Sequence, residues 1–246
     1  MAHPDLQSLL NSLLTDLRAQ VDSSYRDRIA TLFNVDVQDF LGVPTPKIRQ
    51  LSAQYSRQMR HLSLPEVLTR CEVLLQSGIY ECRLIAFDWS FRRSAHLDAH
   101  HFDRFESWLR QYVNGWPDCD DLCTHSLGLV VATFPGVAQR VIPWTGDANP
   151  WLRRAAAVSL IYGLRRGLLL AEALMVAECL LEEEDELVQK GCGWMLKAAS
   201  KSYPDDVFKF VLRYQGQLPR SVVRTAIAKL SDSQRQQVLK HKATSC

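Results

Sequence analysis

The 246-residue chain lacks the marks of secreted, membrane-spanning and zinc-ribbon proteins. Its seven cysteines are an odd number and show no Cys-x-x-Cys spacing, which argues against a disulfide framework and a zinc ribbon. No apolar run approaches the roughly 18 residues of a membrane span, and Met1–Leu10 has no basic segment followed by an apolar core, as a secretory signal would. We therefore expect a cytosolic protein with reduced core thiols and no membrane association.

Metal ligands and strand patterns are also scarce. His96, His100 and His101 lie close together, but no acidic or cysteine partner shares their spacing, so we interpret them as surface residues and predict no metal site. Alternating runs of β-branched residues bounded by turns are missing, whereas a period of 3.6 residues occurs throughout. This pattern predicts an all-α protein.

Charge is distributed unevenly along the chain. The net charge is only +2, but residues 187–246 hold 11 Lys/Arg and three Asp, a net of +8, and the remainder holds 18 Lys/Arg and 24 Asp/Glu, a net of −6. A basic C-terminal quarter fits an anionic partner, and a solvated basic face without a partner is the alternative.

Several segments carry helix-start signals followed by apolar stripes. Thr45-Pro46, Asn149-Pro150, Pro204 and Pro219 predict helix starts, and Ser63 with Glu66 forms a capping-box pattern. The acidic run 182–186 lies at a junction between helices, where the dipole of the next helix favours negative charge. The first helix shows a leucine stripe, made of Leu6, Leu9, Leu10, Leu13, Leu14 and Leu17.

Basic residues recur at one kind of helical position, and one repeat breaks the pattern. Arg83, Arg154, Lys190 and Arg224 are separated by 71, 36 and 34 residues, so a period near 35 leaves one basic residue missing around position 119. The chain there reads Trp116-Pro-Asp-Cys-Asp-Asp121, with Asp120 close to the expected cation, while Tyr80, Trp116 and Trp151 keep an aromatic in register.

Helices of 10–17 residues recurring about every 35 residues are typical of helix pairs stacked into an α-solenoid. We predict a HEAT-like helical repeat over residues 1–246 as a single domain, with a concave face. Small residues follow each basic position, at Ala155–Ala157, Gly191–Gly193 and Thr225–Ala226, and they suit close packing of neighbouring helices.

The repeat places on one face three segments whose side chains could take part in chemistry: residues 114–123, 149–157 and 188–197. Trp116 and Trp194 could be packing residues, and Asp120 and Arg154 could be a cap and a structural ion pair. Together they offer apolar ring faces for sugar and base, a guanidinium for a phosphate, and a carboxylate that could stabilise a cation and hold a water for attack.

These segments resemble the AlkD-type alkylpurine DNA glycosylases of the DNA alkylation repair family, from about Arg28 to Lys229. The family's elements are matched by Phe40-Leu-Gly-Val-Pro-Thr-Pro46, Trp116-Pro-Asp-Cys-Asp120, Trp151-Leu-Arg-Arg154 and Lys190-Gly-Cys-Gly-Trp194. Each match alone is weak, but the four in order at near-repeat spacing are fairly specific.

The resemblance implies hydrolysis of N3- and N7-alkylated purines from duplex DNA by a monofunctional glycosylase. It implies Asp120 as the catalytic carboxylate, with Trp116 and Trp194 lining the lesion site and Arg154 on backbone phosphate. We expect Trp151, Arg153, Lys190 and Arg224 to add DNA contacts. We expect no cofactor, no obligate protein partner, a monomer, and a location in a bacterial-type cytosol or nucleoid.

Three points stay open at this level. Asp118 and Asp121 stand beside Asp120, so the choice of Asp120 rests on its spacing from Trp116. The aromatic that relatives supply from the second helix could be Tyr25 or Phe33. The alternatives to a glycosylase are a catalytically silent DNA-binding relative and a protein-binding scaffold, the usual role of helical solenoids.

Overall fold

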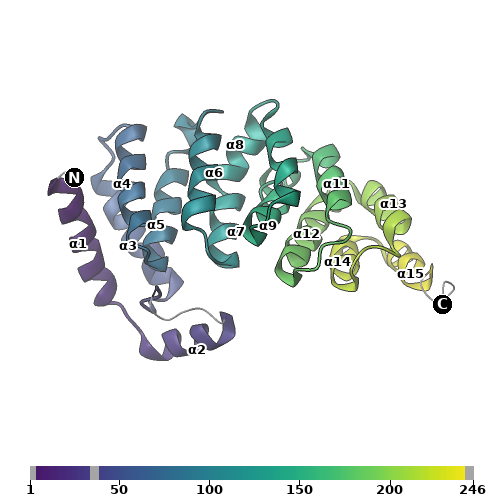
Figure 1. The fold of residues 1–246 in the computed structure, drawn as a ribbon, viewed down its shortest axis with the longest axis horizontal. Helices are drawn as coiled ribbons and strands as arrows, with labels where there is room; N and C mark the ends of the chain where they lie inside the picture. Colours follow the sequence, from purple (N-terminus) through teal and green to yellow (C-terminus); the bar gives the residue numbers. More distant parts are fainter. Residues whose placement is uncertain (1–3, 34–38, 242–246) are drawn as a thin grey trace. The chain divides into compact units, whose positions relative to one another are not determined.

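A computed structural model of the chain describes residues 4–33 and 39–241. Within these residues there are fifteen α-helices, three 3₁₀ helices and no strand (Figure 1), so the prediction of an all-α helical repeat protein is confirmed. No helix among the described residues is both long and apolar enough to cross a membrane. The chain divides into two compact units, residues 1–97 and 98–246; the single domain over 1–246 stays a prediction.

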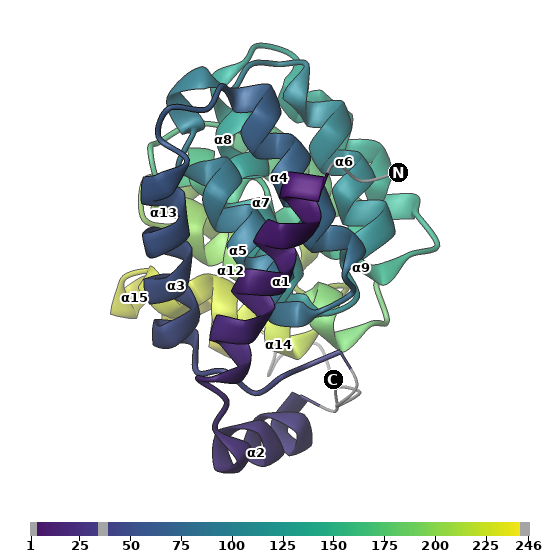
Figure 2. The ribbon, with the colours of Figure 1, turned by 90° about the vertical axis from the view of Figure 1, so that its left-hand side faces the viewer.

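The first unit is a small helical bundle with α1 on one side. Its helices are α1 (Pro4–Arg18), α2 (Ser23–Phe33), α3 (Thr45–Gln58), α4 (Leu64–Gln76), α5 (Tyr80–Phe91) and the 3₁₀ helix η1 (Ser94–His96). α5 packs between α3 and α4, and α1 packs on α3 and α4 (Figure 2). Leu13 and Leu17 of the leucine stripe are fully buried, which fixes α1 to the bundle.

A buried carboxylate organises the loop before α3. Glu81 is fully buried, and its Oε1 accepts hydrogen bonds from the backbone N–H groups of Gly42 (2.9 Å) and Val43 (3.1 Å), while Oε2 accepts one from Leu41 (3.1 Å). Gly42 has a φ of +93°, and a Cβ there would lie 2.4 Å from the Cβ of Arg26. Burial raises the pKa of Glu81, and the backbone hydrogen bonds oppose this rise.

The second unit carries every residue that the sequence assigns to the candidate site. Its helices are α6 (His101–Tyr112), α7 (Trp116–Thr124), α8 (Ser126–Thr133), η2 (Val137–Gly146), α9 (Pro150–Val158), α10 (Ile161–Leu164), α11 (Leu170–Cys179), α12 (Glu186–Ala199), α13 (Pro204–Tyr214), α14 (Arg220–Ala226), η3 (Ile227–Lys229) and α15 (Asp232–His241).

Four helices of this unit form one row. α7 packs on α9, α9 on α12, and α12 on α14 (Figure 1). Their first residues are 34, 36 and 34 positions apart, which matches the period of the basic residues. Tyr80, Trp116 and Trp151 each lie in the first turn of a helix, as their register predicts.

Most predicted helix starts are confirmed, and two are shifted by one residue. Glu66 accepts from the backbone N–H of Ser63 (2.8 Å), and the Asn149 side chain accepts from Trp151 N–H (2.9 Å). Thr45 is already helical, because Pro44 before it has the extended ψ of 136° that ends the loop. Pro219, in the same way, is the residue before α14 rather than its first residue.

The cysteines are free thiols wherever the structure describes them. Cys71, Cys82, Cys119, Cys123 and Cys192 are buried, as predicted, and Cys179 is exposed. Burial raises the pKa of the Cys82 and Cys192 thiols to about 12, so both are protonated and chemically quiet at neutral pH.

Candidate active site on α7, α9 and α12

The three aspartates at the start of α7 have three different environments. Asp118 is fully buried, and its Oδ1 accepts hydrogen bonds from the backbone N–H groups of Gly115 (3.0 Å) and Cys119 (3.1 Å). Oδ2 accepts one from Asn114 N–H at 3.3 Å. Asp118 therefore caps α7 and closes the turn in front of it, which is a structural task.

Asp120 forms a two-pronged ion pair with Arg154 of the neighbouring helix α9. Arg154 Nε donates to Oδ1 at 2.8 Å and Nη2 donates to Oδ2 at 2.7 Å. The Asp120 side chain is 15% exposed and the Arg154 side chain 6%, so the carboxylate keeps a narrow opening to solvent while the guanidinium is covered. Charged, parallel hydrogen bonds of this kind fix orientation as well as distance.

Arg154 also ties α9 to α12. Its Nη1 donates to the backbone carbonyl of Leu187, and its stem lies against Gly191, where a Cβ would come within 3.1 Å of the Arg154 Cγ. The small residue predicted after the basic position Lys190 thus leaves room for the guanidinium. One side chain joins α7, α9 and α12.

Burial and the neighbouring charges together set the pKa values of this pair. Burial raises the pKa of Asp120 above its ordinary value, the Arg154 guanidinium opposes this increase, and the nearby Asp121 adds to it. The Asp120 hydrogen bonds raise the pKa of Arg154, although burial alone would lower it, so the arginine stays charged. With both oxygens on a permanent cation, we assign Asp120 the ionised form at neutral pH.

Asp121 faces a histidine that sequence reasoning did not single out. Its Oδ1 lies 3.5 Å from Nδ1 of His125, one turn later in the chain. That ring nitrogen is also 2.8 Å from the Asp121 backbone carbonyl, and a carbonyl oxygen only accepts, so Nδ1 carries the hydrogen. The four-residue spacing could have suggested the contact.

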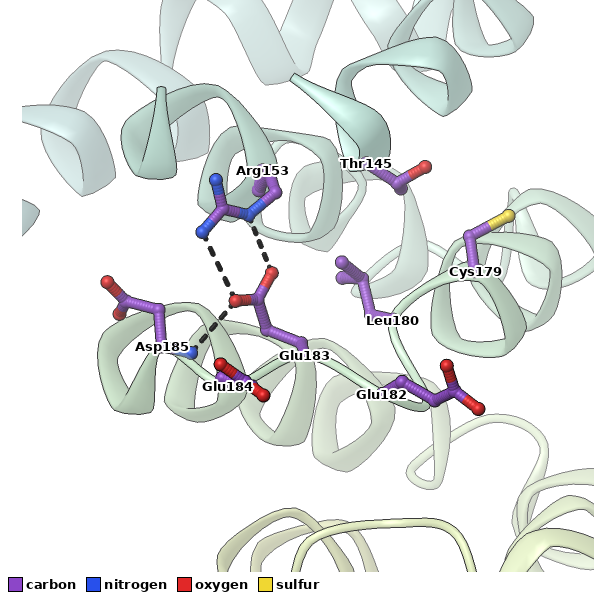
Figure 3. Close-up of a pocket in the computed structure, with 8 residues that line it drawn as sticks. All are labelled: Thr145, Arg153, Cys179, Leu180, Glu182, Glu183, Glu184 and Asp185. Atoms are coloured by element: carbon purple, nitrogen blue, oxygen red, sulfur yellow. Dashed lines mark hydrogen bonds and ion pairs between the residues drawn. The ribbon is translucent and has the colours of Figure 1, made fainter. Parts of the chain in front are cut away.

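Arg153 pairs with the acidic run before α12, and its predicted contact with DNA stays a prediction. Its Nε donates to Glu183 Oε2 at 2.7 Å and Nη2 to Oε1 at 3.2 Å (Figure 3). Its Nη1 donates to the Asp147 carbonyl at 2.9 Å. The side chain is 21% exposed. Asp185 caps α12 through Leu187 N–H at 2.7 Å, so the acidic run stands at the start of a helix, as predicted. The hollow beside Arg153, about 610 Å³, is lined by eight residues, of which four are acidic: Glu182, Glu183, Glu184 and Asp185.

The tryptophans lie partly exposed on the same row of helices. Trp116 is one turn before Asp120 on α7, and Trp151 is in the first turn of α9, with its carbonyl 3.5 Å from the Cys119 sulfur. Trp194 is on α12, where the guanidinium carbon of Arg165 lies 5.8 Å from its ring centroid. The structure brings Asp120 and Arg154 into direct contact, and the tryptophans keep the helical register predicted for them.

The basic residues of the repeat divide into two groups. Arg83 and Arg154 are buried, and Arg83 donates to the Gly78 carbonyl at 2.8 Å. Lys190 is 60% exposed and lies 3.5 Å from Glu186, and Arg224 is exposed on α14. The geometry of Arg154 is thus that of an ion-pair partner, and Lys190 and Arg224 are the members of the series with accessible charge.

Other candidates have simpler positions. His101 Nδ1 is 2.8 Å from Asp98, an acidic partner that the spacing argument overlooked; the described residues contain no group of three or more His, Cys, Asp and Glu that could hold a metal. Tyr25 on α2 has its ring 6.2 Å from that of Phe40. The Phe33 side chain lies outside the described residues.

The fold and the site define a class: an all-α helical repeat protein with a guanidinium-bound carboxylate on one row of helices. A family model described as DNA alkylation repair enzyme matches residues 13–230. The chain therefore belongs to the DNA alkylation repair enzyme family, and that part of the predicted resemblance is confirmed.

A solved structure agrees on the fold. A protein described as a predicted DNA alkylation repair enzyme from Enterococcus faecalis superposes with a TM-score of 0.74, over 87% of this chain and 98% of that chain, at 18% sequence identity. At that identity the similarity concerns the fold. No curated protein matches the chain.

Proposed function

We propose that the protein is a monofunctional DNA glycosylase that removes cationic N3- and N7-alkylated purines from duplex DNA. Membership of the DNA alkylation repair enzyme family supports a role in DNA repair. The Asp120 site supports the reaction class, because it offers one ionised, oriented carboxylate on the same row of helices as partly exposed tryptophans.

One carboxylate is enough for this chemistry. An N3- or N7-alkylpurine already carries a positive charge, so the electron pair of the breaking C1′–N bond neutralises the base as it leaves. Water adds to C1′, its hydroxyl stays on the sugar, and one proton is released. Asp120 stabilises the oxocarbenium-like sugar and holds the water, whereas hydrolysis of an O-glycoside needs a second carboxyl as acid.

The observation that carries the proposal is the two-pronged contact between Asp120 and Arg154, at 2.8 and 2.7 Å. It keeps the carboxylate charged and fixes its direction, which is what a preorganised electrostatic catalyst needs. Arg154 in this scheme is a positioning residue. Lys190 and Arg224 supply DNA backbone contacts, and Trp116 and Trp194 line the lesion.

The setting of the reaction follows from the same proposal. The substrate is duplex DNA carrying alkylated bases, in a bacterial-type cytosol or nucleoid. The protein acts as a monomer without a cofactor or an obligate protein partner.

The test is base release by Asp120→Asn under single-turnover conditions. The substitution keeps the size of the side chain and removes its charge, so we expect release of N3- or N7-methylpurine to fall by ~10²–10³. Binding to alkylated duplex should stay equal or tighten, because a carboxylate near phosphates repels them.

Two neighbouring aspartates provide matched controls. Asp121→Asn should leave base release close to that of the parent. Asp118→Asn should lower the melting temperature, because its oxygens cap α7. Unchanged release from Asp120→Asn would refute the catalytic assignment. A parent protein that binds duplex DNA but releases no base would favour the silent DNA-binding relative instead.

A further inference from the structure

Far from Asp120 in the sequence, the first unit contains a cavity lined by four arginines. The cavity, of about 270 Å³, lies where α3 and α5 end, and Ala53 and Ser56 complete its lining. The arginines are Arg57 and Arg60 from the end of α3 and Arg92 and Arg93 from the end of α5. α3 and α5 pack directly on each other.

Two of these arginines are held in place by the protein. Arg92 Nε donates to Asp88 Oδ2 at 2.6 Å, and Arg93 donates to the backbone carbonyl of Met59. Asp88 also accepts from Ser52 and lies 3.7 Å from Arg49. Asp88 is thus the carboxylate that pairs with Arg92, and it is shared with Arg49, which does not line the cavity.

The other two arginines are not held. Within the described part of the chain, Arg57 and Arg60 make no hydrogen bond or ion pair, and both are exposed. Of the four cationic side chains around this cavity, Arg92 alone pairs with a carboxylate among the described residues, and no carboxylate lines the cavity. Such a concentration of one sign of charge in a concave site attracts anions.

The helix dipole explains part of the arrangement, but not all of it. Cations are favourable at helix C-termini because the last carbonyls lack partners. Arg93 meets this description, since it donates to the carbonyl of the residue that ends α3. Arg57 and Arg60 donate to no carbonyl in the described residues, so the helix dipole does not account for them and their N–H groups are available to a ligand.

We infer that the cavity formed by Arg57, Arg60, Arg92 and Arg93 binds a phosphate group. Guanidinium forks match the oxygens of phosphate in pairs, and the unbalanced charge exceeds what one carboxylate ligand would neutralise. The cavity is below the roughly 300–1,000 Å³ typical of sites that enclose a drug-sized ligand. It therefore takes the phosphate and leaves the rest of the ligand outside.

A phosphate presented by a long chain fits this geometry, and the backbone of duplex DNA is such a chain. That choice of carrier rests on the proposed function, whereas the phosphate site itself does not. The cavity gives the first unit its own backbone contact, separate from Lys190 and Arg224 of the second unit.

The test compares the affinity of the full chain for a short unmodified duplex at several salt concentrations. Neutralising one phosphate contributes roughly −0.9 to the slope of log K against log[salt]. We expect Arg57→Gln and Arg60→Gln together to make the slope shallower by about 0.9, the contribution of one phosphate. Arg57→Lys should preserve the slope, because it keeps the charge. Arg70→Gln is the matched control, since Arg70 lies on α4 of the same unit and donates to the Glu66 carbonyl at 2.9 Å.

A second arm uses inorganic phosphate, measured by titration calorimetry on the parent and on the double variant. We expect binding by the parent and its loss in the double variant. If the parent binds phosphate and the double variant does not, but the salt dependence of duplex binding is the same in both, the phosphate site exists and DNA is not its ligand. A parent that binds phosphate but no duplex would overturn the proposed function and leave this site standing. No effect of the double variant in either arm would overturn the inference.

Discussion

Replacing Arg154 with methionine tests whether the Asp120 site is held together by a buried charge pair. The substitution keeps an apolar stem against α12 and removes three hydrogen bonds, two to Asp120 and one to the Leu187 carbonyl. Asp120 is then left as a nearly covered carboxylate without its cation. The expected result is a less stable protein that still has an acidic residue at position 120.

The size of the effect follows from the exposure of the two partners. Exposed ion pairs contribute about 0–1 kcal/mol, whereas breaking a buried pair costs about 3–5 kcal/mol because one charge remains uncompensated. Arg154 is 6% exposed and Asp120 15%, so the pair is close to the buried limit. Because Asp120 keeps some contact with solvent, the cost of breaking the pair should lie at the lower end of the range for buried pairs. We expect a loss of about 3 kcal/mol in the free energy of unfolding.

Thermal unfolding followed by circular dichroism measures this loss. For a chain of this length, 1 kcal/mol corresponds to a shift of roughly 2–4 °C in melting temperature, so Arg154→Met should melt about 6–12 °C below the parent. The double variant Asp120→Asn, Arg154→Met should melt above Arg154→Met alone, because the uncompensated charge is gone.

Arg154→Lys separates charge from orientation. Lysine keeps the positive charge but lacks the planar fork. Base release should therefore fall clearly below that of the parent, while the melting temperature should stay closer to the parent than that of Arg154→Met does. Affinity for unmodified duplex should stay unchanged, since a covered guanidinium makes no backbone contact. If Arg154→Met melts within about 4 °C of the parent and weakens binding to plain DNA, the pair is not structural, and Arg154 is the phosphate contact predicted from the sequence.

The remaining predictions concern the same row of helices. Burial raises the pKa of Asp120 above its ordinary value of 3.8, and the proposed reaction needs the ionised carboxylate. Single-turnover base release should therefore fall as the pH drops through this raised pKa, and a rate that does not change with pH there would contradict the proposed role. Gly191→Ala places a Cβ 3.1 Å from the Arg154 Cγ, and because three hydrogen bonds hold that side chain in place, the variant should melt below the parent even after a gain of about 1 kcal/mol in helix propensity. Gly216→Ala, with open space around it, should not. Lys190→Gln and Arg224→Gln should each make the salt dependence of DNA binding shallower by roughly 0.9; a slope equal to that of the parent would remove that residue from the DNA contacts.

The period of the helices was predictable because it depends on local signals. Prolines, caps and apolar stripes recur with the repeat, and Asn149 and Ser63 act as the caps their positions indicate. The position of Asp120 opposite Arg154 follows from the same period, since residues 34 apart in such an array lie on neighbouring helices.

The partners of the arginines were not predictable in the same way. A repeat gives the position of a basic residue, but it does not give the residue from the next helix that meets it. Arg83 and Arg154 occupy positions of the basic series and are buried, while Lys190 is exposed. Arg153 pairs with Glu183, which lies 30 residues further on in the acidic run before α12. The dipole of that helix already explained the negative charge of the run, so nothing in the sequence pointed to a cationic partner. Burial depends on packing between helices, which no local pattern encodes.

The guanidinium that joins α7, α9 and α12 fixes the order of the repeats. Arrays of this kind commonly gain and lose whole units, since each unit contacts only its neighbours. Here the carboxylate, its cation and the glycine that makes room for the cation come from three consecutive repeats, those of α7, α9 and α12. Duplicating or deleting one repeat between residues 116 and 199 would keep a stackable array but would separate these groups. Repeat number can therefore vary at the ends of this chain, but not across its centre.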